Sequence, residues 1–397
     1  MNVTMRNPCE KSGESGEQEK EAAAAASGRL TGVQEAEEGL DSDSDSCLET
    51  EGTHGLGELD KETLYLRSCG AHCVVPASCF LHQGKAPELN LRHCGLGPQG
   101  SQALASALIS NSYVKRLDLR DNRLCGAGAE AVAHALSKSR NICDVDLSEN
   151  QLGAAGAQVI CTALMANLAM QKVQLAGNSL EEQAAHYLAE LLLAHTGLKS
   201  LDLSYNQLNN QAGEMLGPAL AENTGLTELN ISWNHLRGPG AVSFARGLGA
   251  NIFLRVLDIS YNGFGDPGAF AVGEALRINN VLEELNMSNN RISAVGALSL
   301  GLGLRVNQTL RILVVSRNPM RSKGCLGVLK SVQNNAVSTL ELLDFSDIQV
   351  NREFDDLASS VKVSHPGLCI KTEGCRVEYK KELLEVFKPS LPASAPK

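Results

Sequence analysis

The sequence predicts an α/β fold in the form of a solenoid, a horseshoe whose inner parallel β-sheet is backed by outer helices. Its 397 residues are 43% hydrophobic but only 4% aromatic, so the core must be aliphatic. One short apolar motif recurs with a 28-residue period through eight successive intervals, followed by a last interval of 30. Such a fixed period is the sequence signature of stacked repeats. We therefore expect ten units with degenerate end caps, centred on Leu89, Leu117, Val145, Val173, Leu201, Leu229, Leu257, Leu285, Leu313 and Leu343.

The first half of each unit is a predicted strand. Residues 114–124 fit the pattern L-x-x-L-x-L-x-x-N-x-L, with Val114 in the first place. Leu117 and Leu119 lie two residues apart, so both side chains point to one face of a strand and into the core. Asn122 follows at the bend, where its amide can satisfy backbone groups that would otherwise be buried without partners. The same position predicts a structural ladder of Asn122, Asn150, Asn178, Asn206, Asn234, Asn262, Asn290 and Asn318.

The second half of each unit is a predicted helix. In the second unit, residues 128–139 place Ala and Leu at spacings of three and four. Most of these helices end near an asparagine, and we expect that residue to adopt the left-handed conformation that closes a helix. The asparagines are separated by whole multiples of the repeat period: Asn111, Asn167, Asn223, Asn251, Asn279 and Asn307.

The two ends of the repeat array depart from this pattern, as the caps of a solenoid must. In the first unit Cys94 replaces the asparagine, and in the last unit Ile348 does. Residues 64–69 predict a degenerate entry strand, and residues 368–370 predict an exit strand. Residues 378–388 predict a short terminal helix, which the Pro-rich end of the chain follows.

The charge pattern divides the chain into three regions. Residues 1–60 contain 15 acidic and four basic residues, whereas the rest of the chain has a net charge of only +1. High charge with few apolar residues predicts disorder, so residues 1–57 are expected to be a disordered acidic leader. Its serines between acidic residues leave a phosphorylated interaction arm as an alternative to simple solvation. We expect the solenoid over residues 58–377 and the helix and tail over 378–397.

The repeats resemble a known family. The 28-residue period, the cores at 201–208 and 257–264 and the GA-x-x-L-type helices are similar to ribonuclease-inhibitor-like leucine-rich repeats. Such repeats also occur in NOD-like receptors and in the Ran GTPase-activating protein. The resemblance implies a horseshoe that binds proteins, and it brings no catalytic residues. Ribonuclease inhibitors alternate two repeat types and are rich in cysteine, so this uniform chain is not expected to inhibit ribonucleases.

The sequence offers no motif for catalysis, a cofactor or a metal. It contains no G-x-x-x-x-G-K-[ST], H-E-x-x-H or G-x-S-x-G segment. Its 12 cysteines form no C-x-x-C pair and its nine histidines share no metal-ligand spacing, so the cysteines are expected to be structural thiols in a reducing compartment. A balanced solenoid predicts no nucleic-acid binding. Since there is no long apolar run and no signal peptide, we expect a cytoplasmic monomer without membrane contact.

The concave face is the candidate binding surface. Tyr205, Trp233 and Tyr261 occupy the same position in three successive units, and neighbouring strands lie about 4.8 Å apart. The three rings should therefore form one contiguous stripe, and Tyr and Trp dominate protein-binding hot spots. Polar candidates beside them are Asp202, Asp258 and His235. The alternative is a structural role, because Asp is common at its position in this repeat and the rings can stack on one another.

Two functions follow from these features. The first is a non-enzymatic scaffold that binds an unidentified protein on the concave face. The alternative is a regulator of a small GTPase resembling the Ran GTPase-activating protein, in which an arginine or an acidic tail engages the GTPase. Four arginines of the early units are the candidates for that role: Arg92, Arg116, Arg120 and Arg123.

Overall fold

The computed structural model describes residues 61–83 and 86–372 of the chain. The chain divides into two units, residues 1–56 and 57–397, and the described residues belong to the second. The predicted leader (1–57) and the C-terminal helix and tail (378–397) lie outside the described residues.

The repeats form one parallel sheet of eleven strands, each hydrogen-bonded to the next in chain order. Each strand is only three residues long, because the chain bends soon after the second leucine that points into the core. The strands are β1 (Glu88–Asn90), β2 (Arg116–Asp118), β3 (Asp144–Asp146), β4 (Lys172–Gln174), β5 (Ser200–Asp202), β6 (Glu228–Asn230), β7 (Val256–Asp258), β8 (Glu284–Asn286), β9 (Ile312–Val314), β10 (Leu342–Asp344) and β11 (Cys369–Lys371).

The register follows the sequence period, which confirms the predicted fold. The central residue of each strand pairs with the central residue of the next, as in Leu117 with Val145 and Leu313 with Leu343. All ten predicted central positions are buried, and Leu119 is buried beside Leu117. The exit strand predicted at 368–370 is also confirmed, since β11 pairs with β10 in parallel.

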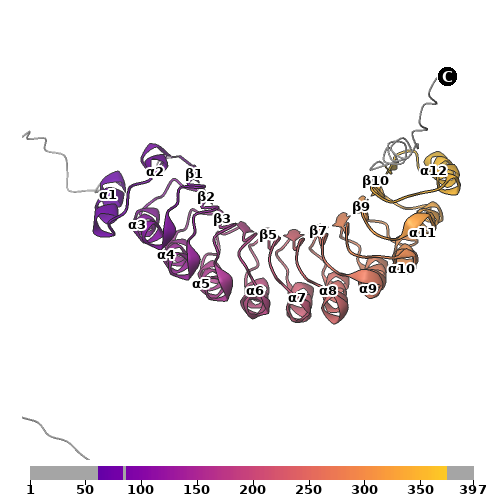
Figure 1. Ribbon diagram of the computed structural model, residues 1–397, viewed down its shortest axis with the longest axis horizontal. Helices are drawn as coiled ribbons and strands as arrows, with labels where there is room; N and C mark the ends of the chain where they lie inside the picture. The colour runs from indigo at the N-terminus through magenta and orange to yellow at the C-terminus, as the bar shows by residue number, and fades with distance from the viewer. Residues whose placement is uncertain (1–60, 84–85, 373–397) are drawn as a thin grey trace, which may run out of the picture. The chain divides into compact units, whose positions relative to one another are not determined.

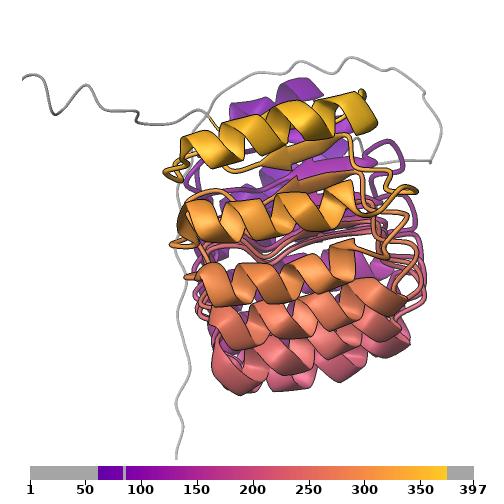
Figure 2. The same cartoon turned by 90° about the vertical axis from the view of Figure 1, so that its right-hand side faces the viewer.

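Helices cover the outer side of the sheet. Figure 1 shows the strands along the inner side of the repeat array and the helices along the outer side, and Figure 2 shows the helices stacked side by side. Their Ala- and Gly-rich faces allow close packing between neighbours. They are α1 (Lys61–Ala71), α2 (Ser78–Gln83), α3 (Gly97–Ile109), α4 (Cys125–Lys138), α5 (Gly153–Ala166), α6 (Glu182–Ala194), α7 (Asn210–Glu222), α8 (Gly238–Ala250), α9 (Gly265–Ile278), α10 (Ala294–Leu304), α11 (Arg321–Gln333) and α12 (Arg352–Ser364).

The asparagines that follow the strands form a buried hydrogen-bonded ladder. Asn206 is typical: its Nδ2 donates to the carbonyls of Leu175, Leu203 and Ser204 at 2.9–3.1 Å. Its Oδ1 accepts from the backbone N–H groups of Asn178 and Leu180 in the preceding unit. Each such side chain therefore joins two units through backbone groups that would otherwise be buried without partners.

The asparagines at the helix ends form a second ladder, and the left-handed conformation predicted for them is wrong. Asn223, Asn251 and Asn279 have φ between −76° and −68° with extended ψ. Their side chains close the helices in another way: Asn251 Nδ2 donates to the carbonyls of Leu220 and Asn223, and its Oδ1 accepts from two following N–H groups. Asparagine suits this position because its side-chain amide makes these hydrogen bonds, and not because it tolerates a left-handed backbone.

The entry strand predicted at residues 64–69 is wrong, because this segment lies within the helix α1. Tyr65 and Cys69 are four residues apart and both are 1% exposed, which is the spacing of one helix face. The Tyr65 ring lies 4.3 Å from that of Phe80 in α2, and its hydroxyl accepts from the Ala77 N–H at 3.0 Å. Two helices rather than a strand therefore cap the open end of the core.

Candidate protein-binding site

Three aromatic rings form a continuous stack on the concave side. The ring centroids of Tyr205 and Trp233 lie 5.1 Å apart at 12° between planes, and those of Trp233 and Tyr261 lie 3.8 Å apart at 9°. Tyr205 is 59% exposed and Trp233 43% exposed, so the stack presents apolar area to solvent. The hydroxyl of Tyr261 accepts a hydrogen bond from Arg317, whose Nε donates to Asp347 at 2.8 Å. We call these three residues the aromatic stripe.

The backbone of the aromatic stripe is left-handed. Tyr205, Trp233 and Tyr261 have φ of 55°, 53° and 53°, and residues at this position of other units share the conformation whatever their size: Asp121, Glu149, Gly177, Asn289, Arg317 and Asp347. A bulky residue costs about 1 kcal/mol or more there, whereas Gly and Asn adopt it easily. The chain therefore carries large rings at positions where small residues would favour stability.

Asp202 and Asp258 lie on the strands beside the stripe and stabilise the backbone. Their Oδ1 atoms accept from the N–H groups of Ser204 at 2.9 Å and Ser260 at 2.8 Å, which forms the turn that ends each strand. The Oδ2 of Asp258 also accepts from Asn286 at 2.9 Å. Their predicted contact with a partner stays a prediction, and both residues line a hollow on the strand side of the stripe.

A pocket of about 300 Å³ opens on the other side of the stripe, after the strands end. Trp233 and Tyr261 form part of its wall, and three basic residues complete it: His235, Arg237 and Arg291. We call these three residues with Gly263 the basic pocket. His235, Gly263 and Arg291 occupy the same position in three successive units, so the pocket is the space that Gly263 leaves between two longer side chains.

The structure thus brings Trp233, Tyr261 and His235 together and separates them from the two aspartates. Arg237 and Arg291 were missed from the sequence. Counting two repeat periods from His235 leads to Arg291, but it does not show that Gly263 opens a pocket between them.

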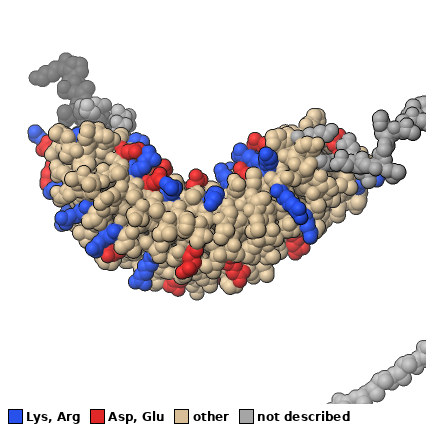
Figure 3. All heavy atoms as spheres, turned by 180° about the vertical axis from the view of Figure 1, so that it is seen from behind, with Lys and Arg blue, Asp and Glu red and all other residues tan. Residues whose placement is uncertain are grey.

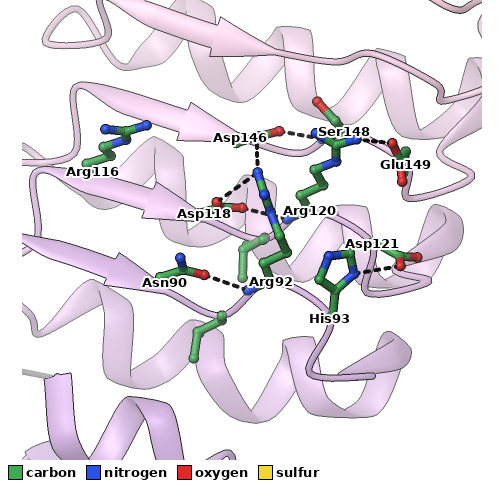
Figure 4. Close-up of polar contacts among 12 residues, drawn as sticks. Asn90, Arg92, His93, Arg116, Asp118, Arg120, Asp121, Asp146, Ser148 and Glu149 are labelled. Carbon is green, nitrogen blue, oxygen red and sulfur yellow. Dashed lines mark hydrogen bonds and ion pairs between the residues drawn. The ribbon is translucent and has the colours of Figure 1, made fainter.

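Charged side chains on the inner side of the first units are paired with one another. Arg92 reaches Asp118 at 3.4 Å and Asp146 at 3.8 Å, Arg120 pairs with Glu149, and His93 Nδ1 lies 2.8 Å from Asp121 (Figure 4). In the space-filling view, basic and acidic side chains lie side by side along this inner edge (Figure 3). A partner of either charge would have to break these ion pairs, so this network is a weaker candidate.

The described residues provide no metal site and no reactive thiol within the candidate site. In the described ranges, no three His, Cys, Asp or Glu side chains come together to hold a metal ion. Burial raises the pKa of the Cys161 and Cys325 thiols to about 12, which keeps both protonated near neutral pH. Every helix in the part of the chain that the structure describes is too short or too polar to cross a bilayer.

Comparisons with known proteins agree with this fold. A family model described as Leucine Rich repeat matches residues 88–105, 110–133, 138–161, 195–217, 222–245, 250–273, 279–301 and 306–328. Leucine-rich repeat-containing protein 74B of Homo sapiens is 86% identical over 393 residues, which cover 99% of this chain and 100% of that protein. The protein of the same name from Mus musculus is 66% identical over 112 residues, 28% of each chain.

Among solved structures, the actin-binding site 2 of leiomodin-1 is similar over 37% of this chain and 76% of that chain. The two share 18% sequence identity with a TM-score of 0.27, and this likeness carries no argument about function. The near-complete match to the human protein and the repeat model agree with the eleven-stranded parallel sheet. The chain therefore belongs to the leucine-rich-repeat proteins, in the family of leucine-rich repeat-containing protein 74B.

Proposed function

We propose that this chain is a non-enzymatic scaffold that binds a protein on its concave face, with the aromatic stripe at the centre of the contact. The observation that carries the proposal is the stack of Tyr205, Trp233 and Tyr261 at left-handed positions, in which the first two rings are exposed and Tyr261 is half-buried. The left-handed backbone at these positions favours Gly or Asn over a bulky residue, and aromatic residues with a large rigid surface dominate the binding energy of protein interfaces.

The surroundings of the stripe suit a protein partner. Three acidic side chains and Lys172 line the strand side, whereas the charged side chains on the other side are all basic, so the charge difference orients a partner segment that crosses the stripe. All nine cysteines among the described residues are free thiols, as expected of a scaffold in the reducing cytoplasm. We propose that it acts there as a monomer.

Three of the four candidate arginines of the early units give no support to regulation of a small GTPase. An arginine that stabilises the transferring phosphate must be free to reach it. Arg92, Arg116 and Arg120 each form an ion pair with a neighbouring carboxylate, whereas Arg123 is exposed and forms no ion pair among the described residues. The scaffold is therefore the function that the described residues favour.

A pull-down from cell lysate tests the proposal, with bound proteins identified by mass spectrometry. The wild-type chain is compared with the triple variant Tyr205→Asn, Trp233→Asn and Tyr261→Asn. Asparagine is the suitable replacement because Asn289 occupies the same left-handed position in the next unit. We expect a partner that the wild type captures and the triple variant does not.

The matched control replaces three other exposed aromatic residues, as Tyr113→Asn, Phe253→Asn and Phe270→Asn. This control should retain the partner. Capture of the same proteins by the wild type and the stripe variant would refute the stripe as the binding centre.

A further inference from the structure

The basic pocket holds two arginines that have no acidic partner in the described part of the chain. Arg237 and Arg291 are exposed, and neither forms an ion pair with a carboxylate of the described residues. The nearby acid Asp266 is already occupied: its oxygens accept from the Ser293 N–H and hydroxyl at 2.8 and 2.6 Å and from the Gly296 N–H at 3.1 Å. The pocket therefore keeps an uncompensated positive charge next to exposed aromatic rings.

Three arginines at other positions of the repeat are neutralised within the chain, whereas Arg123 and Arg321, the equivalents of Arg291 and Arg237 in other units, form no ion pair among the described residues. Arg317 donates to Asp347, Arg311 donates to Glu341 at 2.8 Å, and Arg120 pairs with Glu149. These contacts raise the pKa of each of the three guanidinium groups. An arginine without an ion pair binds a partner carboxylate more favourably, because no existing ion pair has to be broken first.

We propose that the basic pocket binds an aspartate or glutamate side chain of an acidic peptide segment in the protein partner, while an apolar side chain beside that acid packs on the aromatic stripe. The inference rests on the proposed function and deepens it. Arg237 and Arg291 supply forked N–H donors that match a carboxylate, and His235 adds a third polar group. Trp233 and Tyr261 line the same pocket, so the acidic group and its apolar neighbour contact one continuous surface.

The missing side chain of Gly263 makes the room for this acid. A Cβ at this position would lie 3.1 Å from the Cβ of Arg237, and a longer side chain would occupy the pocket between His235 and Arg291. Gly263→Gln should therefore block the pocket without changing its charge, and Gln207 is the residue at the equivalent position two units earlier.

Selection of random dodecapeptides displayed on phage tests the proposal on the immobilised full chain. The wild type is compared with Arg237→Gln/Arg291→Gln and with Gly263→Gln. The matched control is Arg246→Gln/Arg305→Gln, which removes two exposed arginines of α8 and the end of α10 that lie outside the pocket. We expect wild type and control to enrich peptides with Asp or Glu next to an apolar residue, and both pocket variants to lose the acidic preference.

A synthetic copy of the most enriched peptide then gives the affinity. Trp233 is the single tryptophan of the chain, so its fluorescence reports a ligand at the pocket. We expect the Kd to rise about tenfold when each acid of the peptide becomes its amide, and about tenfold when Arg237 and Arg291 become glutamine.

The outcomes separate this inference from the proposed function. The inference is overturned if the peptides selected by the wild type and by both pocket variants contain equal proportions of acidic residues. It is also overturned if the wild type enriches no acidic peptide. A peptide that binds only when phosphoserine replaces its acid also overturns the carboxylate assignment. If Trp233→Asn selects the same peptides as the wild type, the aromatic stripe is not the binding centre and the proposed function is refuted. If the pocket variants lose only the preference for acidic residues and still select apolar ones, the result supports the basic pocket as the carboxylate site.

Discussion

His195 takes the place of an asparagine in the second ladder and bonds to the backbone of Asn167 in the preceding unit. Its Nε2 lies 3.0 Å from the Asn167 carbonyl oxygen. Its Nδ1 lies 3.2 and 2.9 Å from the amide nitrogens of Gly197 and Leu198, which can only donate, so the proton is on Nε2. Because His195 follows Asn167 by one repeat period and is 1% exposed, the imidazole acts as a substitute for the side-chain amide.

This substitution predicts different outcomes for two variants of His195. His195→Asn should stay within about 1 kcal/mol of the wild-type free energy of unfolding, because asparagine makes the same bonds in neighbouring units. His195→Leu should lose about 2–4 kcal/mol, since it leaves a carbonyl and two N–H groups buried without partners. Urea denaturation measures both. Equal stability of the two variants would show that the imidazole fills space and does no more.

Asn206→Leu should destabilise the solenoid by about 3 kcal/mol or more, because Asn206 is 4% exposed and serves backbone groups of two units. Thermal unfolding followed by circular dichroism measures the loss. Gln207→Leu is the control, because Gln207 is the next residue along the chain and is exposed. An unchanged melting temperature for Asn206→Leu would contradict the ladder's structural role.

The sheet and its register were predictable because one period determines every pairing. A strand that slipped by one residue would turn Leu117 and Leu119 toward solvent, so the alternation of apolar residues leaves one register. The entry segment was not predictable in this way. Leu64 and Leu66 alternate as in a strand, yet Tyr65 and Cys69 are the residues that pack, and only contact with Phe80 decides between the two patterns.

The candidate site was predictable only in part, for a related reason. The column of Tyr205, Trp233 and Tyr261 follows from the period alone. The basic pocket depends on a side chain that is missing at Gly263 and on which arginines already have a carboxylate. Ion pairs join residues of neighbouring units through rotamers that the sequence does not specify, so the uncompensated charge of Arg237 and Arg291 emerges only in three dimensions.

The buried thiol of Cys161 predicts a loss of stability at alkaline pH. Burial raises the pKa of Cys161 to about 12 from its ordinary value of 9.0. As pH rises above about 9, the unfolded chain loses this proton first, so it binds fewer protons than the folded chain and the free energy of unfolding falls. Cys161 should contribute a slope of about 1.4 kcal/mol per pH unit, which ends near its folded pKa, and Cys325 contributes in the same direction because burial raises its pKa likewise.

Urea midpoints at increasing pH under reducing conditions test this slope. Cys161→Ala should reduce the slope by about that amount and leave the part that Cys325 contributes, and alanine fits because Ala133 and Ala189 occupy the equivalent positions of the neighbouring units. Cys369→Ala, at an exposed cysteine, should leave the slope unchanged. A slope that is the same in Cys161→Ala as in the wild type would assign the alkaline loss to other groups, such as Cys325 and Tyr65, whose pKa values burial raises to about 12.

Trp233 allows the charge of the basic pocket to be measured without any ligand. Iodide is an anion and acrylamide is neutral, so a positive field near the indole strengthens quenching by iodide alone. We expect Arg237→Gln/Arg291→Gln to reduce iodide quenching of Trp233 and to leave acrylamide quenching as in the wild type. Salt should reduce the difference, because exposed charges are screened over a Debye length of about 10 Å at 0.1 M.

The control Arg246→Gln/Arg305→Gln carries the same change in net charge, so it separates the local field from the charge of the whole chain. Its iodide quenching should match the wild type. If both double variants reduced iodide quenching equally, the field at Trp233 would come from net charge and the pocket would hold no special attraction for a carboxylate. A reduction in acrylamide quenching as well would mean that the substitutions changed the exposure of the indole, because a neutral quencher responds to access and not to charge.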